Sequence, residues 1–297
     1  MMFDSKFTPP LQAIINDITQ EYGVNLYMLR IDLNHPTISG NKLYKLKYNL
    51  FEAQKIKKET LLTFGGAYSN HIAATAAAGK EFNFKTIGII RGEELADLNP
   101  TLKLAKENGM HLHFVFRELY RDKNKLSEYV SEQFKNENYY LIPEGGSNEL
   151  GVLGCKEIVN SISIDFDTIC CACGTGATFA GIAMSLKGEQ KAIGFQVLKA
   201  EGYIKNEVEN WHTKFNYSNP SHWEINEDFH FGGYAKTSPE LISFVSDFEK
   251  KTNIPLEPIY TGKMMYGLFE LIKQNYFKKG ETIIALHTGG LQGNPVN

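Results

Sequence analysis

The amino-acid sequence predicts an α/β fold built from parallel sheets with helices on both faces. Short apolar runs alternate with helical patterns from one end of the chain to the other. The runs are apolar at almost every position, and a helix separates each run from the next. Strands buried on both faces have this continuous apolar character, and helical crossovers join parallel neighbours.

The elements follow one another in that order. In the first half we expect strands at 26–32, 60–64, 85–92, 111–116 and 139–146, and helices at 47–58, 71–82, 101–109 and 123–137. In the second half we expect strands at 166–173, 192–199 and 281–290, and helices at 151–162, 177–187, 239–252 and 264–277. The stretch 200–235 is aromatic, polar and irregular; it either shapes substrate access or forms a packed loop region.

Length and composition narrow the class of protein. A chain of 297 residues suits two domains or one large α/β domain. We expect the boundary between two α/β units near "PEGGSNELG" (143–151). The formal net charge of −3 argues against a nucleic-acid partner or a basic membrane-binding face. We read no secretory signal and no apolar stretch of the roughly 20 residues that a membrane span needs.

The cysteines point to a reducing compartment. Cys170, Cys171 and Cys173 are crowded in one apolar run, and Cys155 stands apart. This spacing suits neither a disulfide framework nor a zinc site, so we expect buried free thiols, a cytoplasmic protein and no metal.

Glycine and small polar residues follow several of the expected strands. After Cys173, the segment from Gly174 to Thr178 has glycines that let a backbone close around an anion such as a phosphate. No Gly-Lys-Ser/Thr ending follows, and Phe179 occupies the third glycine position of a dinucleotide fingerprint. A tight turn with a threonine cap and no ligand is the alternative.

Two further strand ends and one lysine-rich stretch contain residues that could belong to a functional site. In "TFGGAYSNHIAATAAAG", capping explains Ser69 or Asn70, but not the whole run from Tyr68 to His71. "LHTGGLQG" brings His287 to a strand end, where a lone histidine is more often structural than catalytic. Taken alone, "GNKLYKLKYNL" (40–50) is explained by a solvated helix face, unless other segments indicate that it belongs to a functional site.

Taken together, these segments resemble the family of 1-aminocyclopropane-1-carboxylate (ACC) deaminases and D-cysteine desulfhydrases, which are fold type II pyridoxal phosphate (PLP) enzymes. Each matching motif is weak alone, but their common order over most of the chain is specific. The motifs are "GNKLYKLKY" (40–48), "YSNH" (68–71), "PEGGSNELG" (143–151), "CGTGATFAG" (173–181), "EPIYTGKMMYGL" (257–268) and "LHTGG" (286–290). The resemblance implies two parallel-sheet α/β domains with PLP in the cleft between them: a small domain at 48–150, and a large one made of 1–47 and 151–297.

The resemblance also implies roles for matching residues. Lys42 would form the Schiff base with PLP, and burial or a nearby cation such as Lys45 would lower its pKa. Asn70 matches the residue that binds the PLP ring hydroxyl, and Ser69 the one beside the substrate carboxylate and reacting carbon. The match of Tyr234 is looser, because Gly-Gly-Tyr-Ala stands where the family has a Gly-Tyr-Gly type of segment. The expected catalytic residues are Lys42, Ser69, Tyr234 and Tyr260; the expected cofactor-binding residues are Lys42, Asn70, Cys173, Gly174, Thr175, Gly176, Ala177, Thr178, Thr261 and Thr288; the expected substrate-binding residues are Ser69, Asn70, His71 and Tyr260.

The choice of reaction depends on two positions. Family members that open the cyclopropane ring have a glutamate after the active-site tyrosine and a leucine after the final histidine, whereas this chain has Thr261 and Thr288. Threonine at both positions resembles the D-cysteine desulfhydrases and implies β-elimination to pyruvate, ammonia and sulfide. We therefore expect a lyase or deaminase, also classed as a hydrolase, that acts on a small amino acid as a homodimer.

Four alternatives stay open. They are an ACC deaminase giving 2-oxobutanoate and ammonia, a β-replacement synthase, a PLP-binding protein without efficient turnover and, without the resemblance, a protein that binds another nucleotide.

Overall fold

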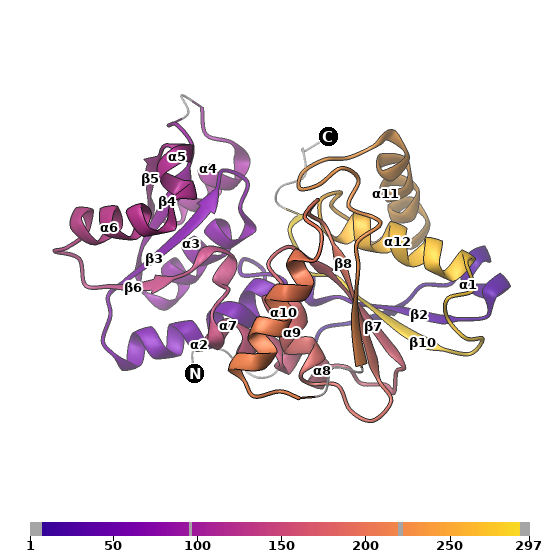
Figure 1. The fold of residues 1–297 in the computed structure, drawn as a ribbon. Helices are drawn as coiled ribbons and strands as arrows, with labels where there is room; N and C mark the ends of the chain where they lie inside the picture. The colour runs from indigo at the N-terminus through magenta and orange to yellow at the C-terminus, as the bar shows by residue number, and fades with distance from the viewer. Residues whose placement is uncertain (1–7, 95–96, 219–221, 292–297) are drawn as a thin grey trace.

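The strands form two separate sheets in a computed structural model that describes residues 8–94, 97–218 and 222–291 (Figure 1). The larger sheet has the order β1-β2-β10-β7-β8-β9. Its strands are β1 (Leu11–Ala13), β2 (Asn25–Leu29), β7 (Thr168–Cys173), β8 (Lys191–Gln196), β9 (Trp223–Asn226) and β10 (Thr282–Leu286). All neighbours in it are parallel except β1, which pairs antiparallel with β2 at the edge.

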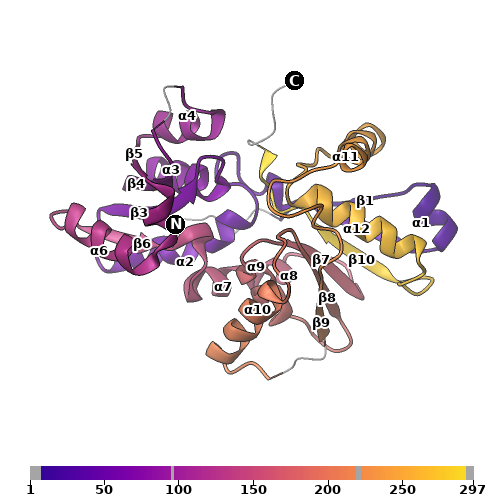
Figure 2. The same cartoon turned by 45° about the horizontal axis from the view of Figure 1, so that its top comes forward.

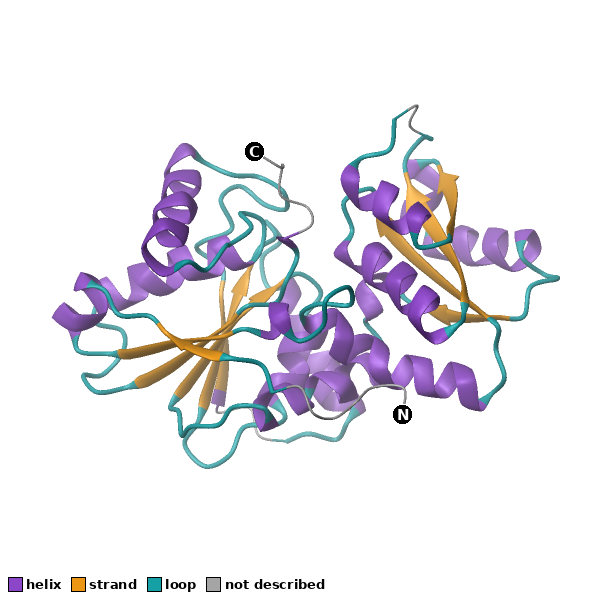
Figure 3. Cartoon of the chain, turned by 180° about the vertical axis from the view of Figure 1, so that it is seen from behind, coloured by secondary structure: helices purple, strands orange, loops and turns teal. Residues whose placement is uncertain are grey.

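The smaller sheet is entirely parallel, with the order β5-β4-β3-β6. Its strands are β3 (Thr60–Gly66), β4 (Lys85–Arg91), β5 (Met110–Val115) and β6 (Tyr139–Ile142). On one face lie α2 (Asn41–Lys55), α3 (Asn70–Phe82) and α4 (Pro100–Glu107), and on the other α5 (Arg117–Arg121) and α6 (Lys123–Gln133). Figure 3 shows this sheet and its helices beside the larger sheet.

Helices also cover both faces of the larger sheet, and β7 shows why its sequence is continuously apolar. Cys170 and Ala172 pack toward α11 (Pro239–Thr252) and α12 (Thr261–Lys273). Cys171 and Cys173 pack toward α7 (Glu149–Cys155), α8 (Glu157–Asn160), α9 (Ala177–Ala183) and α10 (Tyr203–Lys214). Because alternate residues point to opposite faces, a strand covered twice must be apolar throughout. The remaining helix, α1 (Asp17–Tyr22), lies beside α12 (Figure 2).

This architecture confirms the predicted fold class of two parallel-sheet α/β units. The chain enters the smaller sheet after β2 and returns to the larger one after β6, with short 3₁₀ turns at η1 (Ile31–Leu33) and η2 (Glu144–Gly146). The limits of a small domain at 48–150 stay a prediction. All four cysteines are buried and free, as the sequence predicts.

The largest difference from the sequence prediction lies in 200–235. This stretch is not irregular throughout, because it contains α10 and β9. Ile204, Val208 and Trp211 are buried at helical spacing along α10 and pack against α9. The expected strand 139–146 is shorter than predicted: Pro143 follows its last residue, and Gly145 and Gly146 then take left-handed φ angles of 67° and 65°.

None of the helices in the described ranges is long and apolar enough to cross a membrane.

Candidate active site

A cavity of about 730 Å³ receives side chains from both α/β units. From the smaller unit comes the turn between β3 and α3. The start of α2, which carries Lys42, also lines the cavity, and α2 contacts α7 of the larger unit as well as α3 of the smaller one. From the larger unit come the β7–α9 loop, the residues before α12 and the segment after β10. Most of the predicted site residues line this cavity: Lys42, Ser69, Asn70, His71, Cys173, Gly174, Thr175, Gly176, Thr178, Tyr234, Tyr260 and Thr288. Of the predicted set, Ala177 and Thr261 lie outside the lining.

Gly40 places Lys42. Its φ is 69°, and a Cβ there would lie 2.0 Å from the carbonyl oxygen of Thr288. The same carbonyl accepts a hydrogen bond from the backbone N–H of Asn41 at 3.2 Å. Only glycine tolerates both this conformation and this closeness, so the Gly-Asn pair fixes the start of α2 against the segment after β10.

The exposed part of the Lys42 side chain faces the cavity, where the protein favours the neutral amine. Burial, with a smaller contribution from the charge of Lys45, lowers the pKa of Lys42 to about 7. A neutral amine is the form that reacts with a carbonyl group. The predicted low pKa of this lysine is therefore present in the structure.

Lys45 is buried and held at its charged end. Its Nζ donates hydrogen bonds to the carbonyl oxygen of Gly145 at 2.9 Å and to the hydroxyls of Ser147 and Thr175, both at 3.4 Å. Ser147 and Thr175 are themselves joined at 2.8 Å. Lys45 thus ties α2 to η2 and to the β7–α9 loop.

Glycines in the β7–α9 loop, the predicted phosphate-binding loop, let a neighbouring side chain approach the backbone closely. A Cβ at Gly174 would lie 2.9 Å from Cε1 of Tyr260, and Gly176 has a φ of 73°. Thr178 accepts a hydrogen bond from the Asn41 amide at 2.9 Å, which joins the loop to the residue before Lys42. The Cys173 thiol instead points to the carbonyl oxygen of Cys171 at 3.4 Å, and burial raises its pKa.

On the opposite wall, Ser69 caps α3 and accepts a hydrogen bond from the backbone N–H of Ile72 at 3.4 Å. Its own hydroxyl hydrogen is not used in that bond. Asn70 approaches Gly290 so closely that a Cβ there would lie 2.5 Å from the Asn70 Nδ2. Gly290 therefore lets the two sides of the cavity meet.

His71 lies deeper than its neighbours. The Thr63 hydroxyl donates its only hydrogen to the carbonyl oxygen of Ile142 at 2.8 Å, so the 2.8 Å contact between Thr63 and His71 requires the histidine Nε2–H to be the donor. Burial, together with the charges of Lys42 and Lys45, lowers the pKa of His71 well below its usual value. His71 is therefore a neutral imidazole with one nitrogen committed to the protein.

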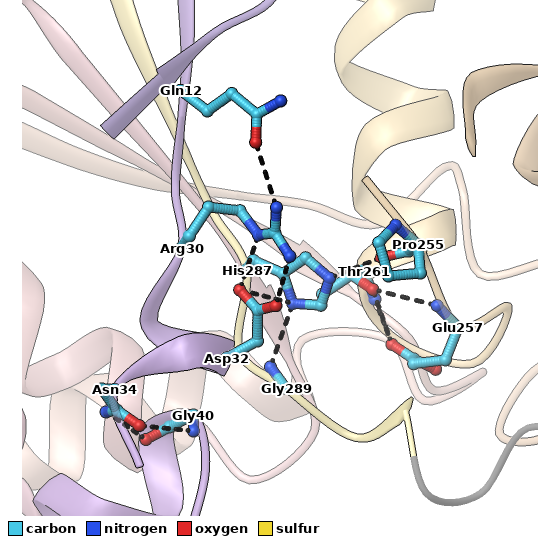
Figure 4. A network of polar contacts seen from close by, with 10 residues as sticks. All are labelled: Gln12, Arg30, Asp32, Asn34, Gly40, Pro255, Glu257, Thr261, His287 and Gly289. Carbon is cyan, nitrogen blue, oxygen red and sulfur yellow. Dashed lines mark hydrogen bonds and ion pairs between the residues drawn. The ribbon is translucent and has the colours of Figure 1, made fainter. Parts of the chain in front are cut away.

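Glu257 is a cavity residue to which the sequence analysis gave no role. It is only 3% exposed, and it accepts hydrogen bonds from the backbone N–H groups of Ile259 at 2.7 Å, Tyr260 at 2.9 Å and Thr261 at 2.5 Å. The Thr261 hydroxyl also donates to it, at 2.9 Å (Figure 4). Burial raises the pKa of Glu257 to about 7, although these four donors act in the opposite direction. Glu257 lies four residues before the first residue of α12, and this position near a helix start is the sequence signal that could have identified it as a cap.

Tyr260 stands where α12 begins, and its ring meets that of Tyr234 edge to face, with 5.9 Å between centroids. Burial and the neighbouring Tyr234 raise the pKa of Tyr260 well above its usual value. The phenol therefore stays protonated at neutral pH and can act as a proton donor.

His287 is structural rather than catalytic. Its Nε2 donates to the carbonyl oxygen of Pro255 at 2.7 Å, and its Nδ1 accepts from the backbone N–H of Gly289 at 3.2 Å (Figure 4). Both ring nitrogens are thus used, and burial lowers its pKa. The nearby Asp32 is held by two hydrogen bonds from Arg30, at 2.9 and 2.7 Å.

A family model described as "Pyridoxal-phosphate dependent enzyme" matches residues 8–289. The chain belongs to this family. A Pyrococcus abyssi protein provisionally named 1-aminocyclopropane-1-carboxylate deaminase is 32% identical over 93% of this chain and 87% of its own. An Arabidopsis thaliana protein named bifunctional D-cysteine desulfhydrase/1-aminocyclopropane-1-carboxylate deaminase is 33% identical over 91% of this chain and 73% of its own.

Solved structures agree with this membership. The chain superposes on an ACC deaminase homologue with a TM-score of 0.83 at 28% identity, covering 97% of this chain and 90% of that one. The fold is also that of a hydrogen sulfide-producing enzyme from Fusobacterium nucleatum, with a TM-score of 0.71 at 18% identity and 98% coverage of both chains. The resemblance to the ACC deaminase and D-cysteine desulfhydrase family is confirmed, and enzymes of this family use PLP. They are lyases and deaminases, so the expected hydrolase class is wrong.

The cavity fits PLP. It offers an amine of low pKa at Lys42, a glycine-containing loop at the end of β7, and an amide at Asn70 on the facing wall. Added Cβ atoms at Gly174 and Gly290 would collide with Tyr260 and Asn70, so these glycines let the two side chains lie against the cavity's backbone.

Proposed function

We propose that this protein is a PLP-dependent lyase that eliminates the β-substituent of a small amino acid, with D-cysteine as its substrate. The observation that carries the proposal is a single cavity holding a lysine with a pKa of about 7, a serine hydroxyl and a protonated tyrosine, with Thr288 in place of leucine. The products would be pyruvate, ammonia and sulfide.

Each residue has a role in this proposal. Lys42 would hold the cofactor covalently, the Gly174–Thr178 segment would receive its phosphate, and Asn70 would bind its ring hydroxyl. When bound, PLP supplies an electron sink for the electron pair left at Cα. Once the substrate amine has displaced it from the cofactor, the Lys42 amine would be free to remove the Cα proton, with Ser69 as the alternative base. Tyr260 would donate a proton to the departing hydrosulfide, and the released product would then react with water to give pyruvate and ammonia.

A second candidate is ACC deaminase, which would release 2-oxobutanoate and ammonia. It is supported by the names of the relatives and by Glu257. The Thr261 hydroxyl donates its hydrogen to this carboxylate, and Thr261 is fully buried and does not line the cavity. A threonine that does not reach the cavity weakens the argument from Thr261 alone against ring opening.

The direct test gives purified, PLP-loaded protein D-cysteine and ACC in parallel and identifies the keto acid. Pyruvate from D-cysteine without 2-oxobutanoate from ACC is the expected result. 2-Oxobutanoate from ACC would replace our proposal with the deaminase. No keto acid from either substrate would favour a PLP-binding protein without efficient turnover. The Lys42→Ala variant provides the blank for all three outcomes.

We also propose that residues 48–150 form the small domain and that the protein is a homodimer. The division of the strands between the two sheets supports the first statement. The second follows only from the resemblance, and light scattering on the purified protein tests it.

A further inference from the structure

Lys263 is a completely buried lysine on α12 that the proposed chemistry does not use. Its Nζ donates hydrogen bonds to three backbone carbonyl oxygens: those of Gly233 at 2.8 Å, His230 at 2.9 Å and Val197 at 3.5 Å. No carboxylate in the described ranges forms an ion pair with it. Burying an ammonium group without an ion partner is costly unless each N–H finds an acceptor, and here three acceptors are supplied.

Two of these carbonyls belong to a strained segment. Phe231, Gly232, Gly233 and Ala235 all have left-handed φ angles, of 53°, 90°, 119° and 56°. Phe231 and Ala235 are not glycine, and a left-handed conformation is unfavourable for a residue that has a Cβ. Strain of this kind persists only where the surrounding structure enforces it. The Lys263 ammonium binds two carbonyl oxygens of this segment from inside the protein.

The segment carries Tyr234 into the cavity. Tyr234 is 43% exposed, and it lines the cavity together with Ala235 and Thr237. Its ring rests against that of Tyr260, which begins the helix on which Lys263 lies. The same helix therefore holds both tyrosines, Tyr260 through the chain and Tyr234 through the carbonyls bound by Lys263.

Lys263 itself does not line the cavity, so it acts on the cavity only through what it holds. We propose that Lys263 is a positioning residue that fixes residues 230–235 and thereby presses Tyr234 against Tyr260, which sets how closely the cavity fits a small amino-acid substrate. This inference rests on the proposed function of the cavity. It assigns residues 230–235, one part of the 200–235 stretch, a role in shaping substrate access.

The test compares Lys263→Met with Lys263→Arg and with a control, Lys273→Met. Lys273 lies on the same helix with its side chain 45% exposed, paired with Glu270 at 2.6 Å. We expect Lys263→Met to raise KM about tenfold or more while kcat changes less than threefold, and to speed hydrogen exchange of the amides of residues 231–236. Lys263→Arg keeps donors for the carbonyls and should restore most of the slow exchange. The control should match the unmodified protein in all three measurements.

A double variant separates positioning from general stability. If Lys263 acts through Tyr234, then Tyr234→Ala alone raises KM, and adding Lys263→Met raises it no further. The proposal would be overturned if Lys263→Met raised KM by the same factor with and without Tyr234→Ala. It would also be overturned if amide hydrogen exchange at 231–236 were unchanged in Lys263→Met. If Lys263→Met does not fold, Lys263→Gln, which keeps two N–H donors, takes its place in the same comparison.

The exchange measurement also separates this inference from the proposed function. If neither D-cysteine nor ACC is turned over, the change of the cofactor absorbance with added amino acid gives a Kd in place of KM. Faster exchange with an unchanged Kd would then mean that Lys263 holds the segment without controlling substrate fit, and the proposal would fail.

Discussion

Lys45 follows Lys42 by one turn of α2, and its charge adds to burial in lowering the pKa of Lys42 to about 7. At that pKa about half of the Lys42 side chains are neutral at pH 7, against roughly 1 in 3,000 for an ordinary lysine. The variant Lys45→Met should therefore raise the pKa of Lys42, but not to its usual value, because burial remains. We expect the pH midpoint for cofactor attachment, followed by absorbance, to move upward.

The matched control for this change is Lys55→Met at the far end of α2, where the lysine side chain is 76% exposed. It should leave the midpoint unchanged. Because Lys45 also binds Gly145, Ser147 and Thr175, the variant should unfold at a lower temperature than the control. A midpoint that stays in place in Lys45→Met would show that burial alone sets the pKa of Lys42.

Gly290 offers a test of the close approach between the two walls of the cavity. In Gly290→Ala the new Cβ would lie 2.5 Å from the Asn70 Nδ2, so Asn70 must move. We expect the Kd for PLP to rise tenfold or more. Gly280→Ala is the control, because Gly280 also has a positive φ, of 86°, but has no atom within 4 Å of the new Cβ. Equal Kd values in the two variants would mean that backbone strain, and not the approach to Asn70, is responsible.

The Tyr260 hydroxyl should matter more for the rate than for binding. Its pKa lies well above the usual value, so it stays protonated and can donate to a leaving group. General acid catalysis of this kind contributes about 10²–10⁴-fold. Tyr260→Phe should lower kcat within that range and leave KM within threefold. Tyr266→Phe is the control, because the Tyr266 hydroxyl on the same helix bonds to Glu240 instead of facing the cavity. A normal kcat in Tyr260→Phe would assign the proton to another donor.

Most of the fold could be predicted from the sequence because burial on both faces leaves a continuous apolar signal in strands such as β7. Helix α11 has the predicted limits, 239–252, since Ser238 caps it and Asn253 ends it in a left-handed conformation. Helix α10 was missed although its apolar spacing is helical, because the aromatic and polar residues around it dominate the composition of 200–235.

The candidate site was harder to predict than the fold. Motifs located its walls, but they carry no information on hydrogen-bond direction or depth. The sequence shows a threonine at position 261, whereas the structure shows that its hydroxyl is already donated to Glu257 and that it does not reach the cavity lining. In the same way, His71 is adjacent to Asn70 in the sequence but is committed to Thr63 in the interior. Such facts depend on contacts between distant segments.

Glu257 should make the free energy of unfolding depend on pH, and the sign of this dependence can be measured. Its folded pKa, about 7, lies above the usual 4.5, so the folded protein binds more protons than the unfolded chain between those values. The stability that Glu257 contributes is therefore full below about pH 4.5 and is lost as the pH rises through 7.

Glu257→Gln removes this dependence and also places an N–H₂ group against backbone N–H donors, which should cost about 1–3 kcal/mol of unfolding free energy. Urea unfolding should thus show a larger loss in Glu257→Gln at pH 4.5 than at pH 7.5. Glu270→Gln, on the exposed part of α12, should show a small loss at both values. A loss in Glu257→Gln that grows with pH would mean that the four donors outweigh burial and keep Glu257 ionised.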